Sequence, residues 1–159
     1  MTLHGIAIDP FTVAYLTAAL WTNEPEAYVV SGPYHTKAAF GLEQINADGI
    51  RKAVADCQCF QLVNAADLRG VQTGYDRDGN SWTGAEQAGH DFWLDRCGHG
   101  VGFRDRKDTY SSKAATERLS AAAQAYGEVY VQWDEDENHP DYGEGGGAPL
   151  IDGGYIYIS

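Results

Sequence analysis

The sequence predicts an α+β fold, in which about four helices pack on a small, mainly antiparallel three-stranded sheet. Two observations support this prediction. Helix signals occur in separate stretches before residue 127, and the apolar period changes to two residues in the C-terminal part. The chain has 159 residues, of which 43% are apolar and 21% charged, as is typical of a globular domain. We therefore expect a single domain over 1–159.

The first helix is predicted over 11–22, where apolar residues recur at helical spacing. Asp9 has the form of its N-cap and Pro10 that of its first residue. The stretch at about 23–41 contains prolines and glycines that break long elements, so we expect an irregular insertion with at most a short strand at 28–30.

A second helix is expected over about 47–68, because an apolar stripe runs along it and Gly70 follows it. The stripe consists of Ile50, Ala53, Val54, Cys57, Phe60 and Asn64. The next segment, 74–80, is rich in glycine, aspartate and asparagine, which predicts a surface loop.

A third helix is predicted by the capping-box spacing of Thr83 and Glu86. In such a box the threonine hydroxyl accepts a hydrogen bond from the glutamate amide, and the carboxylate reaches back to the threonine amide. We expect this helix to run to about Arg96. Cys97 and Gly98 follow as its stop, because glycine adopts the left-handed conformation without a Cβ clash.

A fourth helix is predicted between two further signals. Ser111 or Ser112 has the form of its N-cap, and Gly127 has the form of its end. Beyond it, side chains alternate between apolar and polar faces over about 128–133, which predicts a half-buried strand.

The same alternation at about 154–158 predicts a second strand, joined to the first by an acidic, glycine-rich loop at about 134–149. The third strand is expected at about 99–104. There His99, Val101 and Phe103 would share one face of the strand, and the glycines between them would leave a shallow trough on the other.

The balance of charge restricts the partners of this chain. There are 11 basic and 23 acidic side chains, a net charge of −12, which argues against direct binding of nucleic acid or of anionic lipid. No stretch approaches the roughly 20 apolar residues of a membrane span. Three cysteines and the lack of a secretory signal favour the cytoplasm. A protein or a small molecule remains the expected partner, with no cofactor.

The segment 89–106 holds the densest set of chemically active side chains in the sequence. In one interpretation His90 and His99 form a catalytic acid/base pair, with Asp91 or Asp105 orienting an imidazole, for hydrolysis of nucleotides or phosphodiesters. A ligand would then be held by Trp93, Arg96, Gly100, Gly102 and Arg104. In the other interpretation the aromatic residues pack in the core, aspartate and arginine pair, and His99 satisfies open carbonyls at the helix end.

The cysteines allow one metal hypothesis, which their spacing disfavours. Cys57, Cys59, Cys97 and His99 would make a four-ligand zinc set. A helical Cys-x-Cys, however, directs its two thiols about 200° apart around the axis. Cys57 is therefore expected in the core. The Asp134, Asp136 and Asn138 spacing resembles the start of a calcium loop but lacks the required later glycine and glutamate. We expect no metal.

The segment 89–106 resembles the core of a family of small uncharacterised bacteriophage and prophage proteins, whose typical text is GHDFWLTRNGHGAGFWDR. Further likeness lies at 19–22, 56–60, 64–68 and 125–128, so the resemblance covers most of the chain. The sequence departs from the family by having Asp95 for threonine, Cys97 for asparagine and Arg104 for tryptophan, and by longer text at 25–41 and 134–149.

The resemblance implies a phage accessory protein that acts inside the infected bacterium by binding a host factor or a small signalling ligand. Counteracting a host defence would be one form of this role. Two alternatives remain open from the residues. One is the His-dependent hydrolase. The other is a nucleic-acid mimic that inhibits a host DNA-binding enzyme, suggested by the acidic residues between Asp134 and Glu144.

Overall fold

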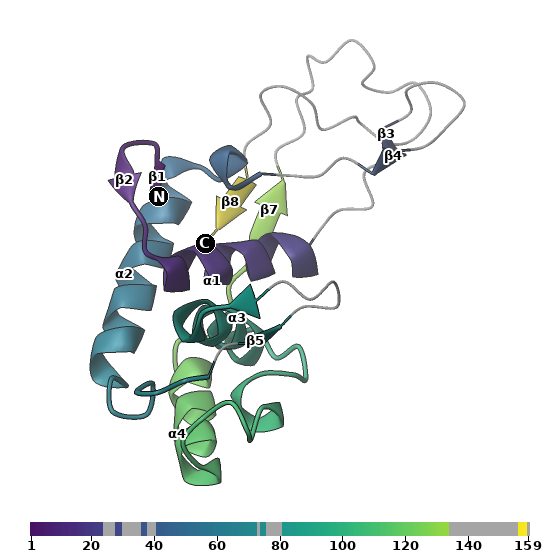
Figure 1. Ribbon diagram of the computed structural model, residues 1–159. Coiled ribbons are helices and arrows are strands. Elements are labelled where there is room, and N and C mark those ends of the chain that lie inside the picture. The colour runs from purple at the N-terminus through teal and green to yellow at the C-terminus, as the bar shows by residue number, and fades with distance from the viewer. Residues whose placement is uncertain are drawn as a thin grey trace.

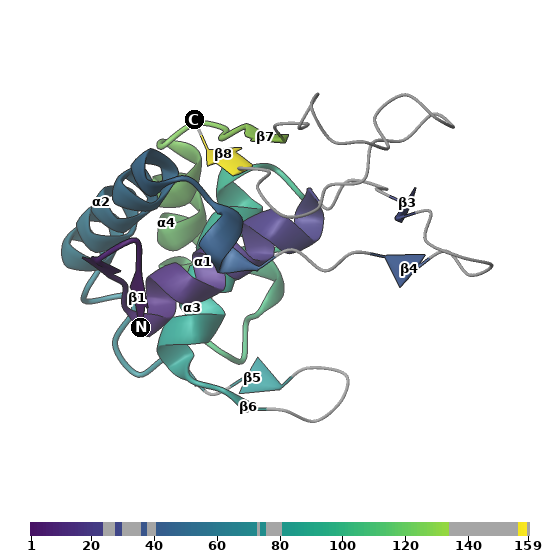
Figure 2. The same cartoon turned by 90° about the horizontal axis from the view of Figure 1, so that it is seen from above.

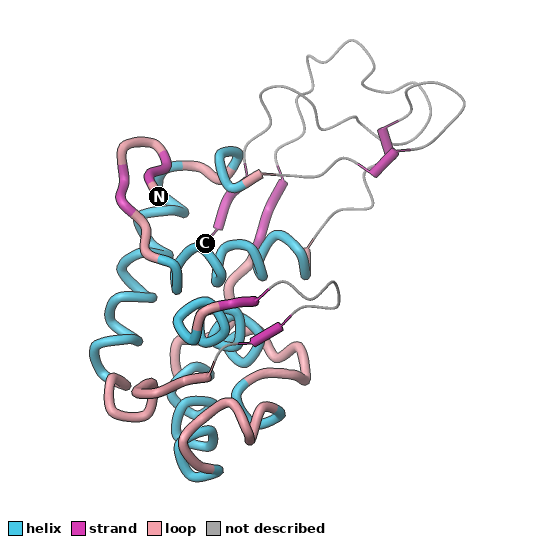
Figure 3. Tube along the Cα trace, viewed as in Figure 1, coloured by secondary structure: helices cyan, strands magenta, loops and turns pink. Residues whose placement is uncertain are grey.

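The computed structural model describes residues 1–23, 28–29, 36–37, 41–72, 74–75, 81–133 and 156–158. Within them the chain forms four α-helices and antiparallel pairs of short strands (Figure 1, Figure 3), so the fold is α+β. The helices are α1 (Pro10–Thr22), α2 (Ala47–Val63), α3 (Gly84–Arg96) and α4 (Lys113–Gln124). The strand pairs are β1 (Thr2–Leu3) with β2 (Ile6–Ala7), β3 (Tyr28–Val29) with β4 (Thr36–Lys37), β5 (Gly74–Tyr75) with β6 (Ser81–Trp82), and β7 (Val131–Trp133) with β8 (Ile156–Ile158).

The predicted helix starts are confirmed by their capping hydrogen bonds. The side chains of Asp9, Thr83 and Ser112 each accept a hydrogen bond from the amide three residues later, at 2.7, 3.3 and 3.1 Å. The carboxylate of Glu86 completes the predicted box by accepting from the Thr83 amide at 2.7 Å. Local side-chain chemistry therefore fixes where α1, α3 and α4 begin.

Two sequence boundaries are corrected. Helix α2 ends at Val63 and not near 68, because Asn64 leaves the helical conformation with a φ of −103° and a ψ of 16°; its side-chain nitrogen donates to the Phe60 carbonyl, and turns follow to Gly70. The expected loop at 74–80 begins with β5, which pairs with β6, and its remainder lies outside the described residues.

The core is built around the contact between α1 and α3, which Figures 1 and 2 show crossing in the middle of the molecule. Gly89 of α3 faces the backbone of α1 so closely that a Cβ there would collide with the Phe11 carbonyl. Aromatic rings fill the space around this crossing, and Phe60 of α2 stacks on Phe92 of α3 with their centroids 4.0 Å apart. The helices therefore bury their apolar faces mainly against one another.

The predicted strand at 99–104 is wrong. Gly98 and Gly100 have φ values of +68° and +77°, which turn the chain, and a 3-10 helix follows at Phe103–Asp105. The strands expected at about 128–133 and 154–158 exist as β7 and β8, paired antiparallel with Val131 opposite Ile158. Every sheet within the described residues has two strands, so the three-stranded sheet is not found there.

Several expected features fall partly or wholly outside the described residues. Of the insertion at about 23–41, the short strand β3 agrees with the strand expected at 28–30, and 24–27, 30–35 and 38–40 are not described. The acidic loop at about 134–149 is also not described. None of the helices in the described ranges has the length and apolar character that crossing a membrane requires.

Candidate functional site

The trough predicted beside Gly100 and Gly102 is filled by the protein at Gly102. Phe103 is fully buried, and its amide donates to the Asp95 carboxylate at 2.8 Å. A Cβ on Gly102 would lie 2.6 Å from the same carboxylate, so the backbone must pass close to Asp95. Gly100 lies in an exposed turn. Gly102 therefore has no space for a ligand beside it, and the ligand-binding role of Gly100 stays a prediction.

Two predicted ligand-binding residues are parts of the core. Trp93 is fully buried, and its indole nitrogen donates to the Thr22 hydroxyl at 2.8 Å. The guanidinium of Arg96 is also buried, and it donates to the Asp56 carboxylate and to the Gly127 carbonyl, each at 2.8 Å. Arg96 thereby links α3 to α2 and to the end of α4, where no ligand group can replace these acceptors without breaking the packing.

Asp91 is the centre of a buried network. Its side chain is fully buried and accepts hydrogen bonds from Gln87, Arg106 and Tyr110 at 3.0, 2.6 and 2.8 Å. Burial and the neighbouring carboxylate raise the pKa of Tyr110 well above its usual value, so its phenol remains a donor. The nitrogen Nδ1 of His90 is 3.6 Å from the carboxylate, beyond hydrogen-bond distance. Asp91 therefore stabilises the fold and does not orient an imidazole.

The structure does not bring the two predicted catalytic imidazoles together. His90 lies within α3, about 9 Å of helical rise before its last residue, and lines a pocket beside α1. His99 lies beyond the helix end, is exposed, and does not line that pocket. Arg104 is exposed on the 3-10 helix. The two imidazoles therefore do not line the same pocket among the described residues.

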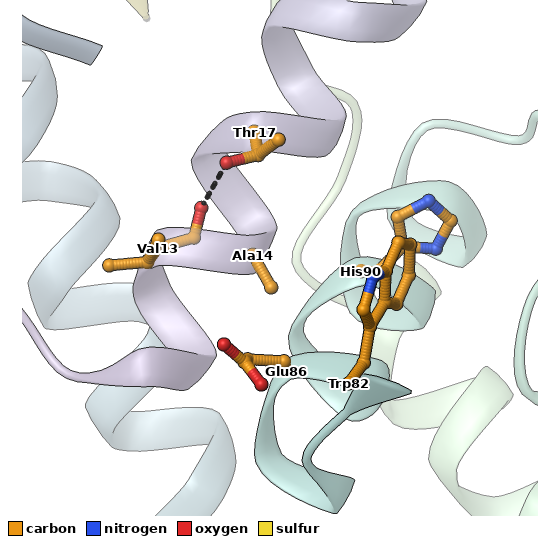
Figure 4. Close-up of a pocket in the computed structure, with 6 residues that line it drawn as sticks. All are labelled: Val13, Ala14, Thr17, Trp82, Glu86 and His90. Carbon is orange, nitrogen blue, oxygen red and sulfur yellow. Dashed lines mark hydrogen bonds between the residues drawn. The ribbon is translucent and has the colours of Figure 1, made fainter. Parts of the chain in front are cut away.

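His90 belongs instead to a small pocket between α1 and α3 (Figure 4). The pocket has a volume of about 160 Å³. Its lining consists of Val13, Ala14 and Thr17 from α1, Trp82 from β6, and Glu86 and His90 from α3. Residues 86 and 90 are four apart on α3, so they lie on the same face of the helix.

Aromatic rings form one side of this pocket. The imidazole of His90 lies between the indoles of Trp82 and Trp21, with centroid distances of 5.0 and 6.0 Å. Trp21 is 62% exposed, which is unusual for so large an apolar side chain. The nitrogen Nδ1 of His90 is buried and has no hydrogen-bond partner among the described residues. This nitrogen lies near the buried Asp91 carboxylate, so the site offers aromatic rings and not a free imidazole nitrogen.

Two of the polar side chains that line the pocket, Glu86 and Thr17, offer oxygen acceptors. One carboxylate oxygen of Glu86, Oε2, accepts hydrogen bonds from the amide and the hydroxyl of Thr83, both at 2.7 Å. No described residue donates to its other oxygen, Oε1. The hydroxyl of Thr17 donates to the Val13 carbonyl at 2.9 Å, as the dashed line in Figure 4 shows, and leaves its lone pairs available.

A second hollow, of about 320 Å³, lies where the end of α2 meets the start of α3, with Phe11, Leu68 and Val71 in its lining. Its polar side chain, Gln61, donates to the Asp9 carboxylate at 2.8 Å. That hydrogen bond supports the N-cap of α1. The described lining of this hollow includes no indole, no imidazole and no carboxylate, in contrast to that of the first pocket. We place the candidate site between α1 and α3.

The cysteines are arranged as their helical spacing predicts. Cys57 is fully buried, which confirms its core position, and Cys59 is exposed on another face of α2. Cys97 is half-buried, and its thiol lies against the Val129 carbonyl. No group of three or more metal-ligating side chains converges within the described part of the chain. The calcium-like segment from Asp134 lies outside that part.

Sequence reasoning missed most of the pocket. Glu86 was recognised only as a helix cap, and Trp82, Val13, Ala14 and Thr17 were not predicted as site residues. The i, i+4 spacing of Glu86 and His90 was an available signal. The chain matches no family model, no curated protein and no solved structure.

Proposed function

We propose that this chain is a binding protein whose pocket between α1 and α3 holds a small ligand. The observation that supports this most is the lining itself, which offers indole and imidazole rings beside a carboxylate. Such a combination of apolar surface with few polar groups is typical of ligand sites. The Thr17 hydroxyl donates to a backbone carbonyl and not to His90, so it is not activated as a nucleophile.

The hydrolase alternative has less support. It requires His90 and His99 to act on one substrate, whereas His90 lines the pocket and His99 lies beyond the end of α3. Arg96, expected to hold an anionic group, is engaged by Asp56 and by backbone carbonyls. The nucleic-acid mimic depends on the acidic loop at about 134–149, so the described residues give it no specific support.

The resemblance to phage and prophage proteins supports the infected bacterium as the place where this ligand is bound. In that setting the chain is an accessory protein of the infected bacterium, and its ligand is a host small molecule. Binding a signalling molecule in the pocket would lower its free concentration and weaken the host response that depends on it.

Ligand-observed NMR with a mixed fragment library tests the binding proposal. We expect fragments that bind the wild-type chain not to bind the Trp82→Ala variant, because the Trp82 indole forms one side of the pocket. If no fragment of any charge binds, the proposal fails. Turnover of a nucleotide panel that disappears in both His90→Ala and His99→Ala variants would establish the hydrolase in its place.

Isolation from infected bacteria tests the biological setting. The chain is purified intact and then denatured, and the released small molecules are identified by mass spectrometry. We expect a metabolite from the wild type that is missing from a Trp82→Ala preparation of equal yield. Equal recovery from both preparations would place the ligand elsewhere on the chain.

A further inference from the structure

The chemistry of the pocket indicates which class of ligand it takes. The described side chains that line it include no lysine and no arginine, and the one formally charged side chain among them is Glu86. Oxygen Oε1 of that carboxylate accepts no hydrogen bond from a described residue, although Oε2 is fully used by Thr83. The chain also carries a net charge of −12. An anionic ligand would meet repulsion here, and a cation would meet attraction.

The rings favour the same class. Trp82 and His90 lie 5.0 Å apart on one side of the pocket, and the Trp21 ring lies beyond the imidazole. The face of an indole attracts a cation because the ring quadrupole places negative charge there. Val13 and Ala14 on the opposite side are apolar, which suits alkyl groups better than a fully hydrated ammonium ion.

We propose that the pocket between α1 and α3 binds an organic cation by its alkylated ammonium head group. The Trp82 face contacts the alkyl groups, and the Glu86 carboxylate balances the charge. The volume of about 160 Å³ is below the roughly 300–1,000 Å³ of sites that enclose drug-sized ligands, so it accommodates the head group and leaves the rest of the ligand outside. This inference rests on the proposed ligand-binding function and names the ligand class.

The test compares choline with 3,3-dimethyl-1-butanol, which has the same shape without the charge. Both are titrated into the full chain and followed by NMR shifts of the indole N–H groups. We expect choline to bind about tenfold more tightly than the neutral alcohol, the difference that one ring contact and one partly exposed carboxylate supply. Equal affinities, or tighter binding of the alcohol, would overturn the cation assignment.

Glu86→Gln is the decisive variant, because glutamine also completes a capping box and therefore preserves the start of α3. We expect about fivefold weaker choline binding and unchanged binding of the alcohol. Glu117→Gln removes an equal charge from an exposed position on α4 and should alter neither affinity. If Glu117→Gln weakens choline as much as Glu86→Gln does, the charge of the whole chain and not the pocket carboxylate is responsible, and the assignment fails.

A second variant examines the ring. Trp82→Leu keeps an apolar surface and removes the quadrupole, so choline should lose more affinity than the alcohol. An equal loss for both would contradict the cation contact. If neither probe binds the wild type but fragments of another class do, the cation assignment is overturned and the proposed ligand-binding function stands. If nothing binds, both fail.

Discussion

The two sides of helix α3 use polar side chains in opposite ways. On the side that faces the core, Asp91 and Arg96 are buried, and their hydrogen bonds join segments far apart in the sequence. On the side that faces the pocket, His90 contributes its ring and Glu86 has an oxygen that no described residue engages. The first arrangement stabilises the fold, and the second leaves a carboxylate oxygen available for a ligand.

This contrast shows why a segment dense in histidine, aspartate and arginine is a poor guide to chemistry by itself. Of the predicted site residues in 89–106, Asp91 and Arg96 have their partners within the protein, whereas His99 and Arg104 are exposed. The predicted site residue that lines a pocket is His90, whose neighbours are aromatic. The following predictions test this contrast, from the largest expected effect to the smallest.

Replacing Asp91 with alanine should have the largest effect on stability. The change leaves Tyr110 and Arg106 without their buried acceptor, so we expect a loss of about 3–5 kcal/mol in the free energy of unfolding. Urea denaturation followed by circular dichroism measures it. Asp48→Ala, which removes an exposed ion pair with Arg51, is the matched control and should cost less than about 1 kcal/mol.

Arg96→Lys preserves the charge but removes the planar fork that reaches Asp56 and the Gly127 carbonyl together. We expect a loss of about 2–3 kcal/mol in the same measurement. Arg118→Lys supplies the comparison, because Arg118 makes a similar two-nitrogen contact with Asp67 at an exposed position. Equal costs for the two substitutions would mean that burial of the Arg96 contacts adds nothing.

Trp93→Phe should cost about 1–2 kcal/mol, because the indole nitrogen loses its hydrogen bond to Thr22 and the smaller ring leaves space in the core. Thermal and urea unfolding report this loss. Trp21→Phe changes the same chemical group at an exposed position and should cost less than about 0.5 kcal/mol. A larger cost for the exposed residue would reverse the proposed roles.

Asp9 is half-buried, and the ionisation of its carboxylate makes the stability of the fold depend on pH. Burial raises its pKa, but hydrogen bonds from Thr12 and Gln61 outweigh burial and hold the pKa below 3.8. The unfolded chain therefore binds the proton more readily, and this stabilisation is present above about pH 4 and is lost as the pH falls through the folded pKa.

The matched variant for this pH effect is Asp9→Asn, which retains a good N-cap without a titrating group. Unfolding free energies measured between pH 6 and pH 2.5 should fall more steeply for the wild type than for the variant. Parallel curves would show that the Asp9 hydrogen bonds do not favour its charged form.

His90→Phe should have the smallest effect on stability. Phenylalanine preserves a ring between Trp21 and Trp82, and it removes a buried nitrogen that has no partner among the described residues. We expect a change within about 0.5 kcal/mol. A loss comparable with that of Asp91→Ala would show that His90 belongs to the buried network, and the division of α3 into two faces would be wrong.

Local signals in the sequence were sufficient for much of the fold. The N-caps at Asp9, Thr83 and Ser112 and the glycine stop after α3 depend on neighbouring residues, so they were predictable. The alternation at 99–104 was misleading, because the positive φ of Gly100 makes a turn where a strand was expected. Glycine patterns do not by themselves distinguish these conformations.

The site depended on tertiary contacts that one sequence does not display. Val13 and Trp82 come from different elements, and only the close approach of α1 to α3 at Gly89 brings them to the same pocket. Likewise, nothing near Arg96 in the sequence shows that its partner is Asp56 on another helix. The exposure of charged groups was therefore the property least accessible to sequence reasoning.

The double role of Glu86 has a consequence for detecting ligands. The same carboxylate that lines the pocket closes the first turn of α3 by accepting from the Thr83 amide. An occupant that restrains this carboxylate must also slow the opening of that turn. Deuterium uptake by the backbone at the start of α3 would then report occupancy directly, even for a compound that neither fluoresces nor reacts.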